Sequence, residues 1–132
     1  MSEFEITPRG GVEEVGRSCF HLQVADRDYL VDCGLKQAEK TEFPTFRGIS
    51  PGEIDAVFIT HAHIDHIGAL PVAEQRNLLA DDAPILMTRP TNAIASILLH
   101  DSLKIHKLET SERNEPQEFT ADDVEFILNR VQ

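Results

Sequence analysis

Apolar and polar residues alternate along the first third of the chain, a period that is typical of strands with one buried face. The alternation covers residues 4–7 and 20–24, and residues 29–31 are apolar throughout. Residues 25–28 form a short polar connection, so the segments on either side of it are predicted to be an antiparallel hairpin. Residues 8–11 are predicted to turn after the first strand.

The middle of the chain is predicted to pass from a loop into a buried strand. Gly34 ends the strand before the loop and can turn the backbone sharply. Residues 35–49 are polar and irregular, and we expect them to cross the mouth of a site. Residues 50–53 have a capping-box pattern that is one turn long. Residues 54–60 then form a strand whose continuous apolar stretch indicates cover on both faces, as in a parallel sheet.

The second half alternates between helix and strand. Residues 67–79 are predicted to be helical, with Gly68 and Pro71 in the first turn, where proline is tolerated. Residues 84–87 form a short strand, and the longest helix follows at 90–108. After a charged loop at 109–118, Thr120 caps a last helix. Strands first, then alternating strand and helix, indicate an α/β layered domain with a mixed sheet.

Four residues directly after the apolar strand carry the candidate chemistry: His61, His63, Asp65 and His66. Side chains two residues apart in an extended segment point the same way, so His61 and His63 can share one metal. Asp65 and His66 can face a second metal. Imidazole with carboxylate suits zinc, manganese or iron better than calcium or magnesium. Two such ions activate water for hydrolysis, and Asp65 can orient that nucleophile or accept its proton.

The remaining histidines, His21, His100 and His106, lack this spacing. For each of them, a solvated or core-edge histidine is favoured over a metal ligand. The alternative for the main cluster, a chance group of surface histidines, is disfavoured because the motif has its expected context of strand then helix.

The composition limits which environments and substrates suit this protein. The net charge is −11, with 12 Lys and Arg against 23 Asp and Glu. Such a surface suits either a protein adapted to high salt or an acidic mesophilic protein, and it repels nucleic acid at low salt. A polyanionic substrate must therefore be held locally, by metal or a few arginines.

Cys19 and Cys33 are predicted to be buried reduced thiols. No apolar run approaches a membrane span of roughly 18 residues, and we expect a cytoplasmic protein.

The cluster His-x-His-x-Asp-His after an apolar strand resembles the metallo-β-lactamase superfamily, and in particular its RNA-processing β-CASP ribonuclease branch. The similarity extends over residues 10–19, 32–34, 54–60, 66–71 and 98–105. It implies the N-terminal half of an αββα sandwich and a two-zinc site, with manganese or iron as alternatives. His61 and His63 would bind one metal and Asp65 and His66 the other, with Asp32 supporting them from behind. The implied reaction is cleavage of RNA phosphodiesters by a metal-activated water.

Family members supply further histidines, a bridging aspartate and an inserted β-CASP domain that residues 1–132 do not match, so we expect a partial domain. No histidine follows His106, which leaves two protein ligands for each metal. The apolar face of the sheet would be bare, as in a protein that pairs with another chain or with itself. A truncated, non-catalytic remnant or binding module is therefore an alternative. A small-ester or thioester hydrolase is a third, disfavoured by Gly-x-Leu-Pro at 68–71 and Gly-Arg-Ser at 16–18.

Overall fold

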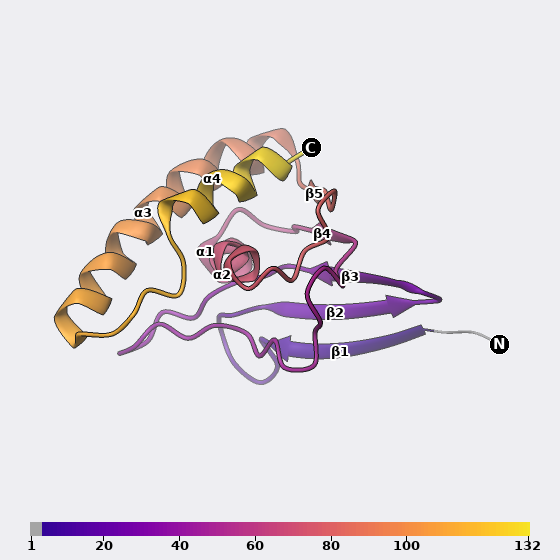
Figure 1. Cartoon of the computed structure of the whole chain (residues 1–132), viewed down its shortest axis with the longest axis horizontal. Helices are drawn as coiled ribbons and strands as arrows, with labels where there is room; N and C mark the ends of the chain where they lie inside the picture. Colours follow the sequence, from indigo (N-terminus) through magenta and orange to yellow (C-terminus); the bar gives the residue numbers. More distant parts are fainter. Residues whose placement is uncertain (1–3) are drawn as a thin grey trace.

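The computed structural model describes residues 4–132, which form one five-stranded sheet with helices packed against it (Figure 1). The elements are, in chain order, β1 (Phe4–Gly10), β2 (Cys19–Val24), β3 (Arg27–Val31), β4 (Ala56–Phe58), α1 (Ile64–Ile67), α2 (Leu70–Gln75), β5 (Ile85–Leu86), α3 (Arg89–Arg113) and α4 (Ala121–Arg130). The strands lie in the order β1-β2-β3-β4-β5. The first three are antiparallel, whereas β3, β4 and β5 are parallel. The predicted α/β class is confirmed.

The first strands form the predicted hairpin, with one correction in β1. Val24 pairs with Arg27, so a tight turn joins β2 to β3. β1 does not turn away after residue 7 as predicted; it continues to Gly10 with a register shift between Pro8 and Gly10. β1 tolerates Pro8 because it is an edge strand, and a bulge absorbs the irregular pairing.

The turn after β3 is made by Asp32 rather than by Gly34. Asp32 has φ +63°, whereas Gly34 is not among the residues with positive φ, so the role predicted for Gly34 was wrong. Aspartate is one of the few residue types that enter the left-handed region readily. Gly34 is needed for a different reason: a Cβ atom there would collide with the backbone of Asp65 and lie 2.6 Å from the His66 amide nitrogen.

Strand β4 is shorter than predicted and is not covered on both faces. Val57 is fully buried, but Phe58 is 39% exposed. The both-faces prediction failed because α2 and α4 lie on one side of the sheet, in front of it in Figure 1. The turn before β4 forms as predicted, with the Glu53 carboxylate accepting a hydrogen bond from the Ser50 amide at 2.8 Å.

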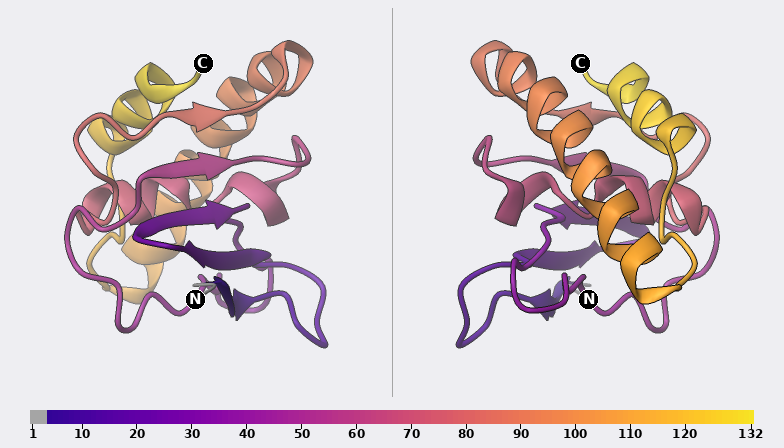
Figure 2. Two further views of the ribbon diagram at one scale, coloured as in Figure 1. Left: turned by 90° about the vertical axis from the view of Figure 1, so that its right-hand side faces the viewer. Right: turned by 90° about the vertical axis from the view of Figure 1, so that its left-hand side faces the viewer.

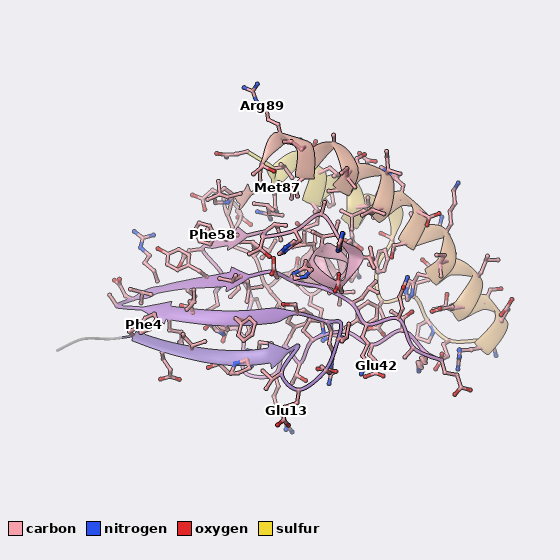
Figure 3. All side chains as sticks on the ribbon, turned by 180° about the vertical axis from the view of Figure 1, so that it is seen from behind. Phe4, Glu13, Glu42, Phe58, Met87 and Arg89 are labelled. Carbon is pink, nitrogen blue, oxygen red and sulfur yellow. The ribbon has the colours of Figure 1, made fainter. Side chains whose placement is uncertain are left out.

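The opposite face of the sheet is apolar and open. Phe4 is 60% exposed, and Ile6, Val24 and Phe58 are exposed as well. Cross-strand pairing of Phe4 with Val24, and of Val31 with Phe58, places these side chains on the same face. Figure 3 looks onto the molecule from this side, with Phe4 and Phe58 labelled. The bare apolar face expected from the sequence is therefore present.

The helix predicted at 67–79 is two shorter helices, α1 and α2. The break follows Gly68, where a Cβ would lie 2.5 Å from the Leu35 side chain. Here the Ala69 amide donates to the carbonyl of Cys33 at 2.9 Å instead of continuing the α1 ladder. A contact between segments far apart in sequence therefore ends α1, and periodicity alone does not reveal it.

The end of α3 and the start of α4 are each set by a capping residue. α3 extends to Arg113, five residues beyond the predicted end, and stops at Asn114, which has left-handed φ +55°. α4 begins after Thr120, the residue predicted to cap it, and the structure completes a capping box with Asp123. Figure 2 (right) shows α3 running diagonally in front of the strands, with α4 beside it.

The core lies between the sheet and its helices. Leu30, Val57 and Ile85, from the three parallel strands β3, β4 and β5, are fully buried. Cys19 and Cys33 are both free and buried, as predicted. Within residues 4–132, none of the helices combines the length and apolar character needed to cross a membrane.

Candidate metal centre

The His61–His66 segment lies at the tip of β4, where the chain turns into α1. His63 precedes the helix in extended conformation, and Asp65 and His66 are in its first turn. The ring centroids of His61 and His66 are 4.7 Å apart, and those of His61 and His63 are 6.2 Å apart. The structure therefore brings the three imidazoles of the motif together as neighbours.

The carboxylate of the motif approaches one of these rings. Asp65 Oδ2 is 3.8 Å from His66 Nε2, the pair predicted to share a metal. Among residues 4–132, however, no three ligand atoms of the motif meet within 4.8 Å of one another. The donors are adjacent but are not gathered around a single point, and their role as ligands remains a prediction.

Asp32 connects the ends of β3 and β4 to α1 through its buried carboxylate. Its Oδ1 accepts a hydrogen bond from the Thr60 amide at 2.8 Å. Its Oδ2 accepts from the Thr60 hydroxyl at 2.7 Å and faces His66 Nδ1 at 2.8 Å. The side chain predicted to support the site therefore contacts one of the four motif residues directly.

These contacts fix which ring nitrogens carry protons. An ionised carboxylate only accepts hydrogen bonds, so His66 Nδ1 donates to Asp32 and the His66 Nε2 lone pair is left free. The Thr60 hydroxyl donates its one hydrogen to Asp32. It therefore accepts from His61 Nδ1, 2.9 Å away, which leaves Nε2 of His61 free as well. Asp32 and Thr60 thus prepare two neighbouring imidazoles to bind a cation through Nε2.

Thr60 is the functional residue that sequence reasoning missed. Its signal was its position, directly before His61 at the end of the apolar strand. Only the spatial approach of Asp32, 28 positions away, shows that its hydroxyl links the carboxylate to a ring.

A second group of ligand-type side chains lies elsewhere in the sheet. One ligand atom each from His21, Asp28 and Glu53 come within 4.8 Å of one another, which would suit a metal. The Arg9 guanidinium argues against this use, because it can only donate and lies 2.9 Å from His21 Nδ1. The proton of His21 is therefore on Nε2, where it donates to Asp28 Oδ1 at 2.8 Å. This group is better explained as a buried hydrogen-bond network.

The three outlying histidines occupy different environments. His100 is exposed, as predicted, and its Nδ1 donates to the Ser96 carbonyl. His21 is 1% exposed and His106 is 6% exposed, so both are in the interior rather than solvated or at the core edge. Their rings are buried because partners remote in sequence satisfy them: Arg9 and Asp28 for His21, and the Glu118 amide for His106.

His106 and His100 are expected to titrate on opposite sides of the ordinary imidazole pKa of about 6.5. Burial lowers the pKa of His106, whereas the Ser96 carbonyl and then the Glu125 carboxylate raise the pKa of His100. Stability from His106 is thus present above pH 6.5 and lost as pH falls through its lowered pKa. The stability from His100 is present below pH 6.5 and is lost as pH rises through the raised pKa of His100. NMR titration of the ring protons measures both, and His106 titrating above His100 would contradict the assignment.

Comparison with known proteins gives the family. Residues 12–77, half of the chain, match the family described as the metallo-beta-lactamase superfamily. Integrator complex subunit 11 of Gallus gallus is 34% identical over 138 residues, covering 99% of this chain and 22% of that protein. The protein named Probable RNase MJ4 of Methanocaldococcus jannaschii is 40% identical over 105 residues, covering 80% of this chain and 24% of that protein. The chain thus spans less than a quarter of the length of these relatives.

A solved structure shares the fold. The crystal structure of a protein of unknown function from Enterococcus faecalis superposes with a TM-score of 0.54 at 16% identity, covering 76% of this chain and 29% of that one. This likeness supports the fold alone. The sequence relatives confirm the resemblance to the β-CASP ribonuclease branch. By the family match, the chain belongs to the metallo-beta-lactamase superfamily.

Proposed function

We propose that this chain carries the metal-binding motif of a hydrolase that cleaves RNA phosphodiester bonds. The observation that carries the proposal is the pair of neighbouring imidazoles, His61 and His66, whose Nε2 atoms are left free by Thr60 and Asp32. A relative named as a probable RNase supports RNA as the substrate class.

The donor set fits the metals that such a reaction uses. Three imidazoles and one carboxylate match the ligand preference of zinc, with manganese or iron as alternatives. His61 and His63 would hold one ion, and Asp65 and His66 the other. When bound, two such ions lower the pKa of a water and stabilise charge on a phosphate oxygen.

Side chains around the motif orient the metal ligands and the attacking water. Asp32 and Thr60 hold the rings of His66 and His61 in the required tautomers and orientations. The Asp65 carboxylate, at the start of α1, can orient an attacking water or accept its proton. We place this activity in the cytoplasm, and zinc is the metal we expect.

The 132-residue chain is expected to bind zinc weakly and to show little ribonuclease activity alone. Its motif supplies two ligands for each ion, whereas a catalytic zinc takes three protein ligands plus water. Metal analysis after equilibrium dialysis, paired with cleavage of a labelled RNA, tests this. His63→Ala should reduce zinc binding further, whereas His100→Ala, at an exposed histidine of α3, should not.

Robust cleavage with two zinc ions per chain would contradict the two-ligand limit. Zinc binding unchanged in His63→Ala would overturn the site itself.

The open face of the sheet favours a second candidate, a binding module that pairs with another chain or with itself. Phe4, Ile6, Val24 and Phe58 form an exposed apolar surface on β1, β2 and β4. Surfaces of this kind mark interaction sites in soluble proteins. A chain that binds no zinc but sediments as a dimer would favour this candidate over the hydrolase.

A further inference from the structure

A cavity beside the candidate metal centre has the features of a ligand site. It has a volume of about 230 Å³ and lies between the loop after β3 and helix α3. Leu35, Gln37, Ile64 and Leu98 line it and also line a neighbouring cavity that reaches His63 and Asp65. The cavity is therefore adjacent to the one that reaches the metal motif.

Flat aromatic groups form one end of this cavity. The His106 ring stacks on Phe119 with centroids 4.6 Å apart and planes 7° apart. Phe43 meets His106 edge to face at 6.1 Å. With the aliphatic side chains of Leu35, Leu98 and the rest of the lining, these rings make a mostly apolar wall that suits a planar ligand.

His106 contributes a hydrogen-bond donor that no described residue uses. Its Nε2 accepts from the Glu118 amide at 2.9 Å, so the proton of the neutral ring is on Nδ1. Across residues 4–132, Nδ1 takes no hydrogen-bond partner, although the residue is only 6% exposed and lines the cavity. The nitrogen is not one of the buried polar atoms that lack a partner, so it is accessible to solvent and available to a ligand in the cavity.

Glu109 contributes the complementary acceptor. Its carboxylate lines the same cavity and accepts one shared hydrogen bond, from the Thr41 hydroxyl at 2.9 and 3.2 Å. A carboxylate has about four lone-pair sites, so it can accept two further hydrogen bonds from a ligand.

We propose that this cavity binds a guanine base of the RNA, an inference that rests on the proposed function and names a subsite for it. The Glu109 carboxylate and the His106 N–H together present two acceptors and one donor. Guanine's Watson–Crick edge offers the match, since N1–H and the 2-amino group donate and O6 accepts. Adenine and cytosine place a ring acceptor against the carboxylate, and uracil has only one N–H. Reading an unstacked base by its Watson–Crick edge between aromatic side chains is a common mode of RNA recognition.

Cationic side chains lie next to this subsite, together with the carboxylates of Glu109, Glu115 and Glu118. Lys40, Arg76 and Arg113 line an adjoining cavity that shares Phe43 and His106 with the first. Lys40 and Arg76 pair with exposed glutamates, and such pairs are weak enough to exchange for a phosphate group.

Calorimetric titration of the metal-free chain with the four nucleoside monophosphates tests the subsite. GMP is expected to bind about tenfold more tightly than AMP, CMP or UMP, the scale of a bidentate base contact. Glu109→Gln should abolish the preference, because an amide offers one acceptor in place of two. Glu112→Gln, an equal change of charge at an exposed position of α3, should leave it intact.

NMR provides a readout that does not depend on the variant. GMP should shift the ring signals of His106 in the unaltered chain while leaving those of His100 in place. The proposal is overturned if GMP does not bind at millimolar concentration, if the four nucleotides bind equally, or if Glu109→Gln keeps the preference. Because no metal or cleavage enters these measurements, their failure is distinguishable from failure of the zinc and ribonuclease experiments.

Discussion

Replacing Gly34 by alanine should lower the free energy of unfolding by about 4 kcal/mol or more, enough to unfold a marginally stable domain. The added Cβ would collide with the carbonyl group of Asp65. Neither side can move away easily, because the Ser18 amide donates to the Asp65 carbonyl at 3.0 Å and the Cys33 amide donates to the His66 carbonyl at 2.8 Å. These bonds attach the metal motif to the turn after β3.

Denaturant unfolding followed by circular dichroism measures this loss. Gly52→Ala is the matched control: Gly52 has φ +73° but no atom within 4 Å of an added Cβ, so only backbone strain of about 1 kcal/mol is expected. If the two variants were equally stable, close backbone packing at Gly34 would not be what holds the motif in place.

Gly34 also shows what the sequence could and could not predict. A glycine after a strand indicates an unusual backbone requirement, but it does not say whether the requirement is a turn or a close approach. The turn angle belongs to Asp32, and the close approach depends on α1, more than 30 residues later.

Local patterns predicted the elements where local interactions decide them. The β2–β3 hairpin follows from period-two alternation around a short turn, and the start of α4 follows from the cap at Thr120. The division of the helix at Gly68 was not predictable in this way, because the bond from Ala69 to Cys33 that ends α1 joins distant segments. The same holds for the burial of His21 and His106.

The candidate site, too, has one part that local sequence predicts and another that depends on contacts distant in sequence. The types and spacing of His61, His63, Asp65 and His66 were enough to predict a metal motif at a strand tip. The protonation of the rings depends on Thr60 and Asp32, whose contact joins β4 to β3. Such a requirement is visible only once the strands are placed side by side.

Asp32→Asn is expected to weaken zinc binding by about 10- to 100-fold, the usual effect of losing a group that orients metal ligands. Asp32 accepts hydrogen bonds on both oxygens, from the Thr60 amide on one and from the Thr60 hydroxyl and His66 on the other. An asparagine has only one oxygen, so in either orientation its NH₂ group faces a donor. If that donor is His66 Nδ1–H, the ring must move or shift its proton to Nε2, the atom needed for the metal. Asparagine tolerates the left-handed φ of this position, so the backbone turn should survive.

Competition with a chromophoric chelator measures the affinity, and ¹⁵N shifts of the His66 ring in the metal-free chain report the tautomer. Asp28→Asn is the control, because it removes the same charge from the network around His21 and can still accept from His21 through its remaining oxygen. If the His61–His66 motif binds the ion, Asp32→Asn weakens binding and Asp28→Asn does not. The reverse result would move the metal to His21, Asp28 and Glu53, and Arg9 would then have to withdraw from His21 Nδ1. The two substitutions therefore decide between the predicted His61–His66 motif and the group of His21, Asp28 and Glu53, whose ligand atoms already lie close together.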